Sequence, residues 1–220
     1  MDDLKKRGRQ GEMEDKDILI LVDNGHGNNT PGKRSPDGKV IESAYTREIA
    51  SKVVSGLRRL GYDADLLTPE IYDVKLIERV HRVNVKCQSR GRDNVLCVSI
   101  HCNAAGNGKE WLKATGWEIW TSPGKTKSDD LADHFVKMAK RHFEGQAVRE
   151  WKKVDGERDK EARFTILTDT LCPAVLTENF FMDCRKDVRY LLSDEGKNAI
   201  VRCHIDAIVS YIESVYDRGN

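Results

Sequence analysis

The chain has 220 residues, of which 33% are charged, and a formal net charge of +1. This length is enough for one sizeable core, and a mixed, nearly neutral charge is unlike the strongly basic composition of proteins that bind nucleic acids. No apolar stretch approaches the length needed to cross a bilayer, so no membrane span is expected.

Short apolar runs alternate with amphipathic patterns from residue 18 onward. This alternation predicts one α/β domain, with three αβα layers around a mostly parallel, twisted sheet of about six strands. The charged residues 1–16 are predicted to form a flexible leader before this domain. The predicted strands are 18–22, 62–67, 95–100, 117–121, 164–167 and 173–177. The predicted helices are 43–60, 73–88, a helix capped by Ser128, and 194–217.

The six cysteines form no CxxC pair, and several lie inside apolar runs. In a chain of this length without a recognisable signal peptide, we expect reduced thiols. Cys102 directly follows His101. Because neighbouring residues of a strand point to opposite faces, we expect its thiol to point away from that imidazole.

Three ionisable residues stand just past the ends of three predicted strands. They are His26, His101 and Glu178. Ligands of open α/β sheets bind beyond the carboxyl ends of the strands, so these side chains are predicted to meet at one edge of the sheet. Glu42, at the start of the first predicted helix, adds a second carboxylate.

Two imidazoles and a carboxylate form a suitable ligand set for a single Zn²⁺ ion that keeps an open position for water. His26, Glu42 and His101 are therefore the predicted metal ligands. Zinc lowers the pKa of its bound water to about 7, and Glu178 is predicted to act as the general base that takes the water proton. Asn103, in the loop after His101, is predicted to hold a polar group of the substrate.

Each of these residues has a simpler interpretation when taken alone. A single histidine near a strand end is more often structural than a ligand, and a glutamate such as Glu42 in the first turn favourably complements the helix dipole. Glu178 alone is explained equally well as an ion-pair partner. Their joint position at one edge of one predicted sheet favours the metal site.

The motifs around these residues resemble those of the zinc-dependent N-acetylmuramoyl-L-alanine amidases of the amidase 3 family, and they follow the family's order. The resemblance covers about residues 17–214. The matching segments are Ile20-Leu21-Val22-Asp23-Asn24-Gly25-His26-Gly27, Glu42, Arg82-Val83-Asn84, the SIHxNA-like segment 98–104 and the PAVLxE-like segment 173–181.

The resemblance implies that residues 17–220 form a zinc amidase catalytic domain that binds one Zn²⁺ ion through His26, Glu42 and His101, with Glu178 as the catalytic glutamate. The implied reaction is hydrolysis of the amide bond between N-acetylmuramic acid and L-alanine in peptidoglycan. The family pattern is not complete: the loop after Gly27 differs, and Asn179-Phe180-Phe181 stands where Gly-Phe is common.

Two expectations about the setting of the enzyme follow. The segment 105–116 shows no obvious long helix of the kind that blocks some relatives, so an open site is expected. Residues 1–16 lack the apolar segment of a signal peptide. We therefore expect the protein to be held in the cytoplasm and to act on the wall after release, as phage lysins do, or by another export route.

The sequence leaves two other functions open and disfavours a third. A zinc amidohydrolase of another small amide remains open, as does a non-catalytic derivative that binds the cell wall, although a binder has no need of Glu178. A nucleotide-binding doubly wound domain is disfavoured, because no GxGxxG or GxxxxGK[ST] sequence follows any predicted strand.

Overall fold

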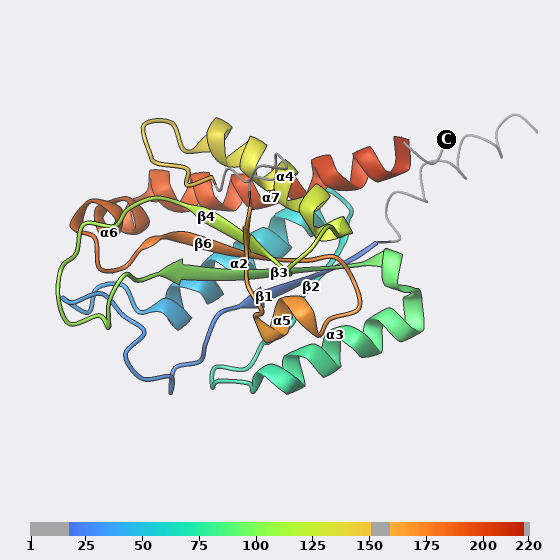
Figure 1. Cartoon of the computed structure of the whole chain (residues 1–220), viewed down its shortest axis with the longest axis horizontal. Helices are drawn as coiled ribbons and strands as arrows, with labels where there is room; N and C mark the ends of the chain where they lie inside the picture. The colour runs from blue at the N-terminus through green and yellow to red at the C-terminus, as the bar shows by residue number, and fades with distance from the viewer. Residues whose placement is uncertain (1–17, 151–158, 218–220) are drawn as a thin grey trace, which may run out of the picture.

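A computed structural model describes residues 18–150 and 159–217. These residues form a six-stranded sheet between two layers of helices (Figure 1), which confirms the predicted α/β fold. The predicted leader, residues 1–16, lies outside the described residues. The strands are β1 (Leu19–Asn24), β2 (Asp63–Leu66), β3 (Val95–Asn103), β4 (Glu118–Thr121), β5 (Lys160–Glu161) and β6 (Ala174–Phe181). The helices are α2 (Glu42–Arg59), α3 (Leu76–Arg90), α4 (Lys127–His142), α5 (Thr165–Thr168), α6 (Arg185–Leu192) and α7 (Asp194–Asp217).

The strand order is β2-β1-β3-β6-β4-β5. The first four strands in this order are mutually parallel, whereas β4 runs antiparallel to β6 and β5 pairs in parallel with β4. The sheet is therefore mostly parallel, as predicted. The strands β1, β3 and β6 consequently end at the same edge, and this edge carries the predicted site residues.

Each face of the sheet is covered by its own helices. The helices α2, α4 and α7 pack on one face and enclose the larger core, which includes Ile20, Val98 and Val175. The helices α3 and α5 lie on the opposite side (Figure 1), over Leu21 and Leu176. Because alternate residues of a strand point to opposite faces, burial on both faces explains why these strands are continuous apolar runs.

The predicted strand at 164–167 is wrong. Thr165–Thr168 form the short helix α5 instead, with Phe164 before it in an extended conformation. A short apolar run does not distinguish a strand from a buried helical turn. The helical turn buries Ile166 and Leu167 together against the same face of the sheet.

The predicted cap of α4 was misplaced by two residues. Thr126 precedes α4 and accepts a hydrogen bond from the Ser128 backbone nitrogen at 3.1 Å, while the Asp129 carboxylate accepts one from the Thr126 backbone nitrogen. This reciprocal capping box satisfies two backbone donors at the helix start. The Ser128 hydroxyl instead accepts from the Ala174 backbone nitrogen at 3.0 Å, which ties α4 to β6.

Other features agree with the sequence or add to it. All six cysteines are buried and form no disulfide, as expected. The helix α6 and the two-residue strand β5 were not predicted, and the helix expected to start near residue 73 starts at Leu76. No helix in the described ranges is both long and apolar enough to cross a membrane.

Candidate metal centre

The structure brings the three predicted ligands together. Candidate ligand atoms of His26, Glu42 and His101 all lie within 4.8 Å of one another, and no other such group of histidine, cysteine or acidic residues occurs in residues 18–150 and 159–217. The Glu42 Oε2 atom lies 3.4 Å from His26 Nε2, and its Oε1 atom lies 3.2 Å from His101 Nδ1. The remaining four histidines are not part of this group.

Glu42 is the first residue of α2 and is only 1% exposed. Its Oε1 atom also accepts a hydrogen bond from the Cys102 backbone nitrogen at 3.1 Å, while its Oε2 atom is buried without a hydrogen-bond partner. A buried charged oxygen without a partner is costly. A divalent cation between the carboxylate and the two imidazoles would satisfy it, so the donor set fits one Zn²⁺ ion.

Two glycines allow the His26 loop to pass close to its neighbours. A Cβ atom on Gly25 would overlap the imidazole ring of His101, and one on Gly27 would overlap the backbone at Asp73. His26 between them has a φ of 62°, in the left-handed region that favours glycine. Gly25 therefore lets the loop that carries His26 approach His101, and Gly27 lets this loop pack against the backbone at Asp73.

Hydrogen bonds made by the loop that follows Gly27 stabilise this conformation. The Thr30 hydroxyl accepts from the Gly27 nitrogen at 3.1 Å and donates to Asp73 Oδ2 at 2.9 Å. The Asn29 carboxamide oxygen accepts from the Asp73 nitrogen at 2.7 Å. The departure from the family pattern thus supplies contacts that anchor the loop next to His26.

The surroundings shift the pKa values of the three ligands in different directions. Burial lowers the pKa of His26 to about 4, so its imidazole is neutral at pH 7 and offers a lone pair. Burial alone would raise the pKa of Glu42, but the hydrogen bond from His101 and the charges of both imidazoles outweigh it and lower that pKa. Burial opposes protonation of His101, yet the hydrogen bond and charge of Glu42 raise its pKa above the usual value.

Glu178 lies beside this group on the neighbouring strand. It is the register partner of His101 across β3 and β6, and of Glu118 across β4 and β6, so the three side chains point to one face of the sheet. Its Oε2 atom is buried without a hydrogen-bond partner. Burial, reinforced by the charges of Glu42 and Glu118, raises the pKa of Glu178 to about 8 despite the opposing charge of His101. A carboxyl group with this pKa can both take up and release a proton near neutral pH.

Two buried polar groups near the site were not predicted. Asn179 donates from Nδ2 to the His101 carbonyl oxygen at 2.9 Å and to the Thr177 hydroxyl at 3.1 Å. Beneath the His26 loop, Arg79 forms an ion pair with Asp23 at 2.7 Å. A polar residue inside an apolar strand must find a partner when buried, and this is the signal by which Asn179 is recognisable in the sequence.

Asn103 and the Arg82-Asn84 pair have partners within the protein. The Asn103 Nδ2 atom donates to Glu118 Oε1 at 2.8 Å, and its role in substrate binding stays a prediction. Arg82 forms an ion pair with Glu70 at 2.8 Å. Asn84 donates to the Asp169 carbonyl oxygen and accepts from the Leu171 nitrogen, each at 2.9 Å, so it holds the connection between α5 and β6.

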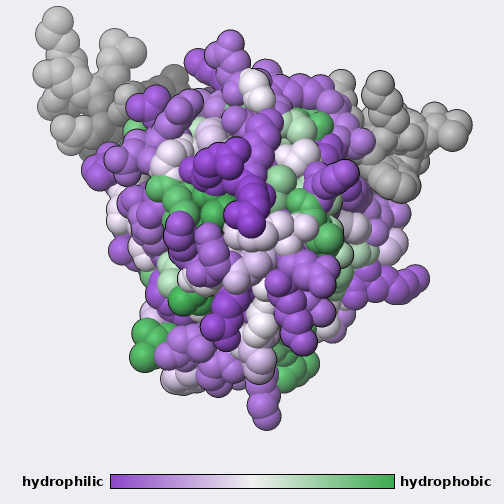
Figure 2. Space-filling view, turned by 90° about the vertical axis from the view of Figure 1, so that its left-hand side faces the viewer, coloured by the Kyte–Doolittle hydropathy of each residue, from purple (hydrophilic) through white to green (hydrophobic). Residues whose placement is uncertain are grey.

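A cleft of about 470 Å³ opens over His26, His101 and Glu178. Viewed toward the end of the sheet at which β1 and β3 finish, the surface is mostly hydrophilic, with small hydrophobic patches among the polar side chains (Figure 2). The segment between β3 and β4 contains no helix, in agreement with the expected lack of a blocking helix.

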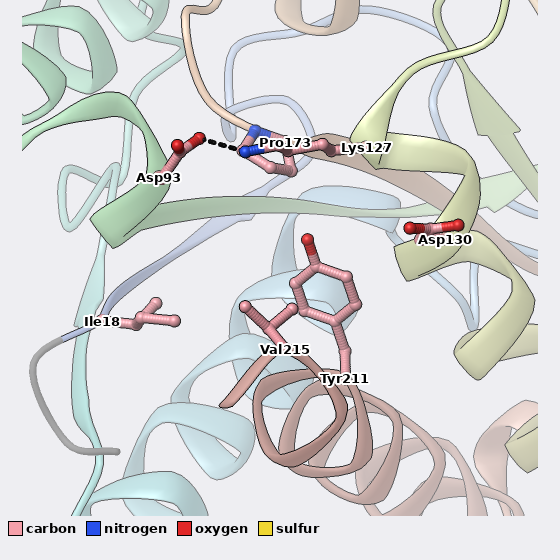
Figure 3. A pocket seen from close by; sticks show the side chains of 7 residues that line it. All are labelled: Ile18, Asp93, Lys127, Asp130, Pro173, Tyr211 and Val215. Carbon is pink, nitrogen blue, oxygen red and sulfur yellow. Dashed lines mark hydrogen bonds and ion pairs between the residues drawn. The ribbon is translucent and has the colours of Figure 1, made fainter. Parts of the chain in front are cut away.

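A smaller cavity, of about 180 Å³, lies at the opposite end of the sheet, where β1 and β6 begin (Figure 3). An ion pair joins Lys127 and Asp93 across its rim at 2.7 Å. Its lining offers no imidazole and no thiol. The lining residues are Ile18, Asp93, Lys127, Asp130, Pro173, Tyr211 and Val215.

Residues 20–210 match the sequence profile of the family Amidase_3, described as N-acetylmuramoyl-L-alanine amidase. The chain belongs to this family. The family predicted from the sequence motifs is therefore confirmed, and the four predicted catalytic and ligand residues, His26, Glu42, His101 and Glu178, all lie inside the matched region.

Individual amidases and endolysins are similar over most of the chain. The endolysin of Bacillus phage SPP1 is 26% identical over 201 residues, which are 88% of this chain and 66% of that protein. The N-acetylmuramoyl-L-alanine amidase CwlM of Bacillus licheniformis is 28% identical over 198 residues, 87% of this chain and 67% of that one. The chain thus spans about two thirds of the length of these curated relatives.

Solved amidase structures share the fold. The N-acetylmuramoyl-L-alanine amidase from Clostridium difficile 630 superposes with a TM-score of 0.76 at 22% identity, over 90% of this chain and 98% of that one. The catalytic domain of CwlV, an amidase from Bacillus (Paenibacillus) polymyxa var. colistinus, gives a TM-score of 0.72 at 21% identity, over 89% and 98%.

Proposed function

We propose that this chain hydrolyses the amide bond between N-acetylmuramic acid and L-alanine in peptidoglycan, with one Zn²⁺ ion held by His26, Glu42 and His101 and with Glu178 as the general base. The observation that carries the proposal is the convergence of three donor side chains within 4.8 Å, beside a buried carboxyl whose Oε2 atom has no hydrogen-bond partner. Family membership supports the choice of substrate.

When bound, zinc supplies Lewis-acid polarisation of the substrate carbonyl and lowers the pKa of water to about 7. The protein contributes the proton transfers. Glu178 takes the proton of the attacking water and passes it to the amide nitrogen of L-alanine as the bond breaks. The raised pKa of Glu178, about 8, makes its carboxylate a stronger base than that of an exposed glutamate. Because Glu178 itself returns the proton, protonation of the leaving amine needs no other residue.

Other residues hold this geometry. Asn179 fixes the backbone of His101 through its carbonyl oxygen, and the Cys102 nitrogen fixes the Glu42 carboxylate. Partners of this kind orient metal ligands and tune their basicity. Because each ligand comes from a different element, the centre is complete only when β1, α2 and β3 are packed together.

The test is digestion of purified sacculi followed by mass spectrometry of the products, with and without a chelator. We expect stem peptides that begin with a free L-alanine amine, together with glycan strands that retain the lactyl carboxyl group. Chelation should abolish their release, and added Zn²⁺ should restore it. Release of disaccharide-peptides with the muramoyl amide intact would contradict the proposal. Cleavage of small amides but not of sacculi would favour the alternative amidohydrolase. Binding to sacculi without cleavage would favour the wall-binding derivative.

We also propose that the protein reaches the wall after the membrane is breached, with residues 17–220 as the catalytic domain and 1–16 as a leader. The similarity to the endolysin of Bacillus phage SPP1 supports this route. Cells that express the chain should keep their turbidity until the membrane is permeabilised and should then lyse. Lysis of intact expressing cells at the same rate would contradict it.

A further inference from the structure

The cleft extends beyond the metal centre, between the start of α3 and the start of α5. This extension, which we call the peptide arm, is defined by Lys33, Lys75, Leu76, Arg163 and Phe164, all of which line the cleft. Leu76 and Phe164 line the cleft and are 54% and 40% exposed, so they present apolar surface on two of its rims. Clefts that bind ligands combine apolar walls of this kind with a few polar groups.

Two of the three acidic side chains that line the cleft, Asp23 and Asp73, are already paired with a cation. Arg79 forms ion pairs with both Asp23 and Asp73, at 2.7 and 3.0 Å. The same guanidinium donates to the Val74 and Asn24 carbonyl oxygens, so it is committed to the protein. The remaining acidic residue of the lining, Glu178, is the register partner of His101 on the neighbouring strand and belongs to the metal centre.

The cations of the peptide arm are not compensated in this way. Lys33, Lys75 and Arg163 form no ion pair with any residue in the described part of the chain. Lys33 lines the cleft together with His26 and Glu178, and its carbonyl oxygen accepts a hydrogen bond from the Glu42 nitrogen at 2.9 Å, so this residue lies beside the metal centre. The arm therefore carries excess positive charge beside apolar surface, and a bound divalent cation would increase it.

The two halves of the proposed substrate differ in the same properties. The glycan half is uncharged, because its sugars carry hydroxyl and acetamido groups and its lactyl carboxyl is consumed in the amide bond. The peptide half begins with the methyl group of L-alanine. Its second residue, a glutamate linked through its γ-carboxyl, leaves an α-carboxyl that is either free or amidated. Negative charge thus occurs only on the peptide side of the bond that is cut.

We infer that Lys75 and Arg163, assisted by Lys33, bind the carboxylates of the stem peptide, and that the enzyme prefers stems whose second residue carries a free α-carboxyl over stems in which it is amidated. This inference rests on the proposed function. Phe164 and Leu76 cover the apolar part of the stem, and the glycan leaves the cleft on the opposite side. An ionic hydrogen bond is about twice as strong as a neutral one, so the loss of one carboxylate is measurable as a change in rate.

The experiment uses the full chain with bound metal and two preparations of the same sacculi. In one, the α-carboxyl groups of the second residue are free, and in the other they are amidated. The initial rate of stem release is measured over a range of substrate concentrations. We expect the parental enzyme to be about tenfold faster on the free form at low substrate concentration, through KM rather than kcat. The double variant Lys75→Gln/Arg163→Gln should cleave both preparations at similar rates.

A matched control separates this effect from a general change of charge. Lys137→Gln/Arg141→Gln removes the same two charges from the exposed surface of α4 and should keep the parental preference. Metal content and Tm should be equal in all three proteins. Equal parental rates on the two preparations, or a preference that survives in Lys75→Gln/Arg163→Gln, would overturn the inference while leaving the proposed function intact. Release of no stems from either preparation would overturn the proposed function and this inference with it.

Discussion

Each end of the sheet carries a cavity with charged side chains, but the two cavities differ in how these side chains are paired. At the amino end, Lys127 and Asp93 are 60% and 74% exposed and neutralise each other at 2.7 Å. At the carboxyl end, Glu42 and Glu178 each keep one buried oxygen without a hydrogen-bond partner. The comparison teaches that a cavity alone does not mark a functional site. The carboxyl end is set apart by donor side chains that converge within 4.8 Å of one another beside a buried carboxyl group, an arrangement typical of functional sites.

The largest effect on activity at the carboxyl end is expected from Glu178→Gln. The amide keeps the shape of the side chain but cannot accept the water proton. We expect the metal content to stay at the parental value and turnover on sacculi to fall by about 10³-fold. Metal analysis and the rate of stem release measure both. The exposed Glu110→Gln should change neither, and digestion by Glu178→Gln at the parental rate would show that Glu178 is not the base.

His204 tests the polar network beneath the carboxyl end. Its ring is buried between the Thr177 hydroxyl and the Ile200 carbonyl oxygen, at 2.9 and 2.8 Å, and burial lowers its pKa to about 4 despite the latter bond. Between pH 6.5 and 4 the unfolded chain therefore binds a proton that the folded chain does not. Stability is complete above pH 6.5 and falls as the pH drops towards 4, by about 3 kcal/mol in total.

The measurement is urea unfolding of the parental protein and of His204→Gln at several pH values. Glutamine does not titrate, so the variant lacks this component, and contributions from other groups cancel in the difference between the two proteins. The gap between their free energies of unfolding should shrink as the pH falls. Parallel curves from pH 7 to 4 would show that His204 does not titrate as described.

Gly25→Ala tests the close approach of the His26 loop to His101 within the candidate metal site. The added Cβ overlaps the His101 imidazole, so this ligand must shift. We expect metal affinity to fall by about 10- to 100-fold, as when a supporting contact of a ligand is lost, with activity recovering at high Zn²⁺. Asn28→Ala changes an exposed side chain in the same loop, so its metal affinity should match that of the parent. Unchanged affinity in Gly25→Ala would contradict the close approach of the two elements.

The smallest effect is expected at the amino end. Lys127→Gln breaks an exposed ion pair, and such pairs contribute about 1 kcal/mol at most. Thermal unfolding should shift only slightly, and the rate of stem release should not change. A large loss of activity in this variant would mean that the cavity at the amino end also contributes to function, which would remove the contrast between the two ends.

The sequence predicted the site better than its surroundings. Apolar runs predict β1, β3 and β6, and the rule that parallel strands end at one edge places His26, His101 and Glu178 together. Glu42 followed from its place at the start of a helix. The three residues at strand ends follow from strand direction alone, and the alternation of strands with helices predicts that direction.

The supporting contacts could not be predicted in the same way. The segment 164–167 is too short for its period to be recognised, and the helical turn found there places Phe164 on the rim of the cleft. The choice of Thr126 over Ser128 as the cap depends on what Ser128 bonds to on β6. The role of Asn179 depends on the His101 carbonyl oxygen on another strand. All three are decided by contacts between segments distant in the chain.

Phe180 has a left-handed backbone, with a φ of 65°, and its fully buried ring packs against Phe143 and Tyr190 at centroid distances of 5.2 and 5.0 Å. A bulky residue keeps such a conformation only while its surroundings enforce it. The packing of the three rings therefore holds the backbone at the end of β6, two residues from Glu178. Replacing Phe143 or Tyr190 by a smaller residue would loosen this packing and shift Glu178, the proposed general base, although neither aromatic residue lines the cleft.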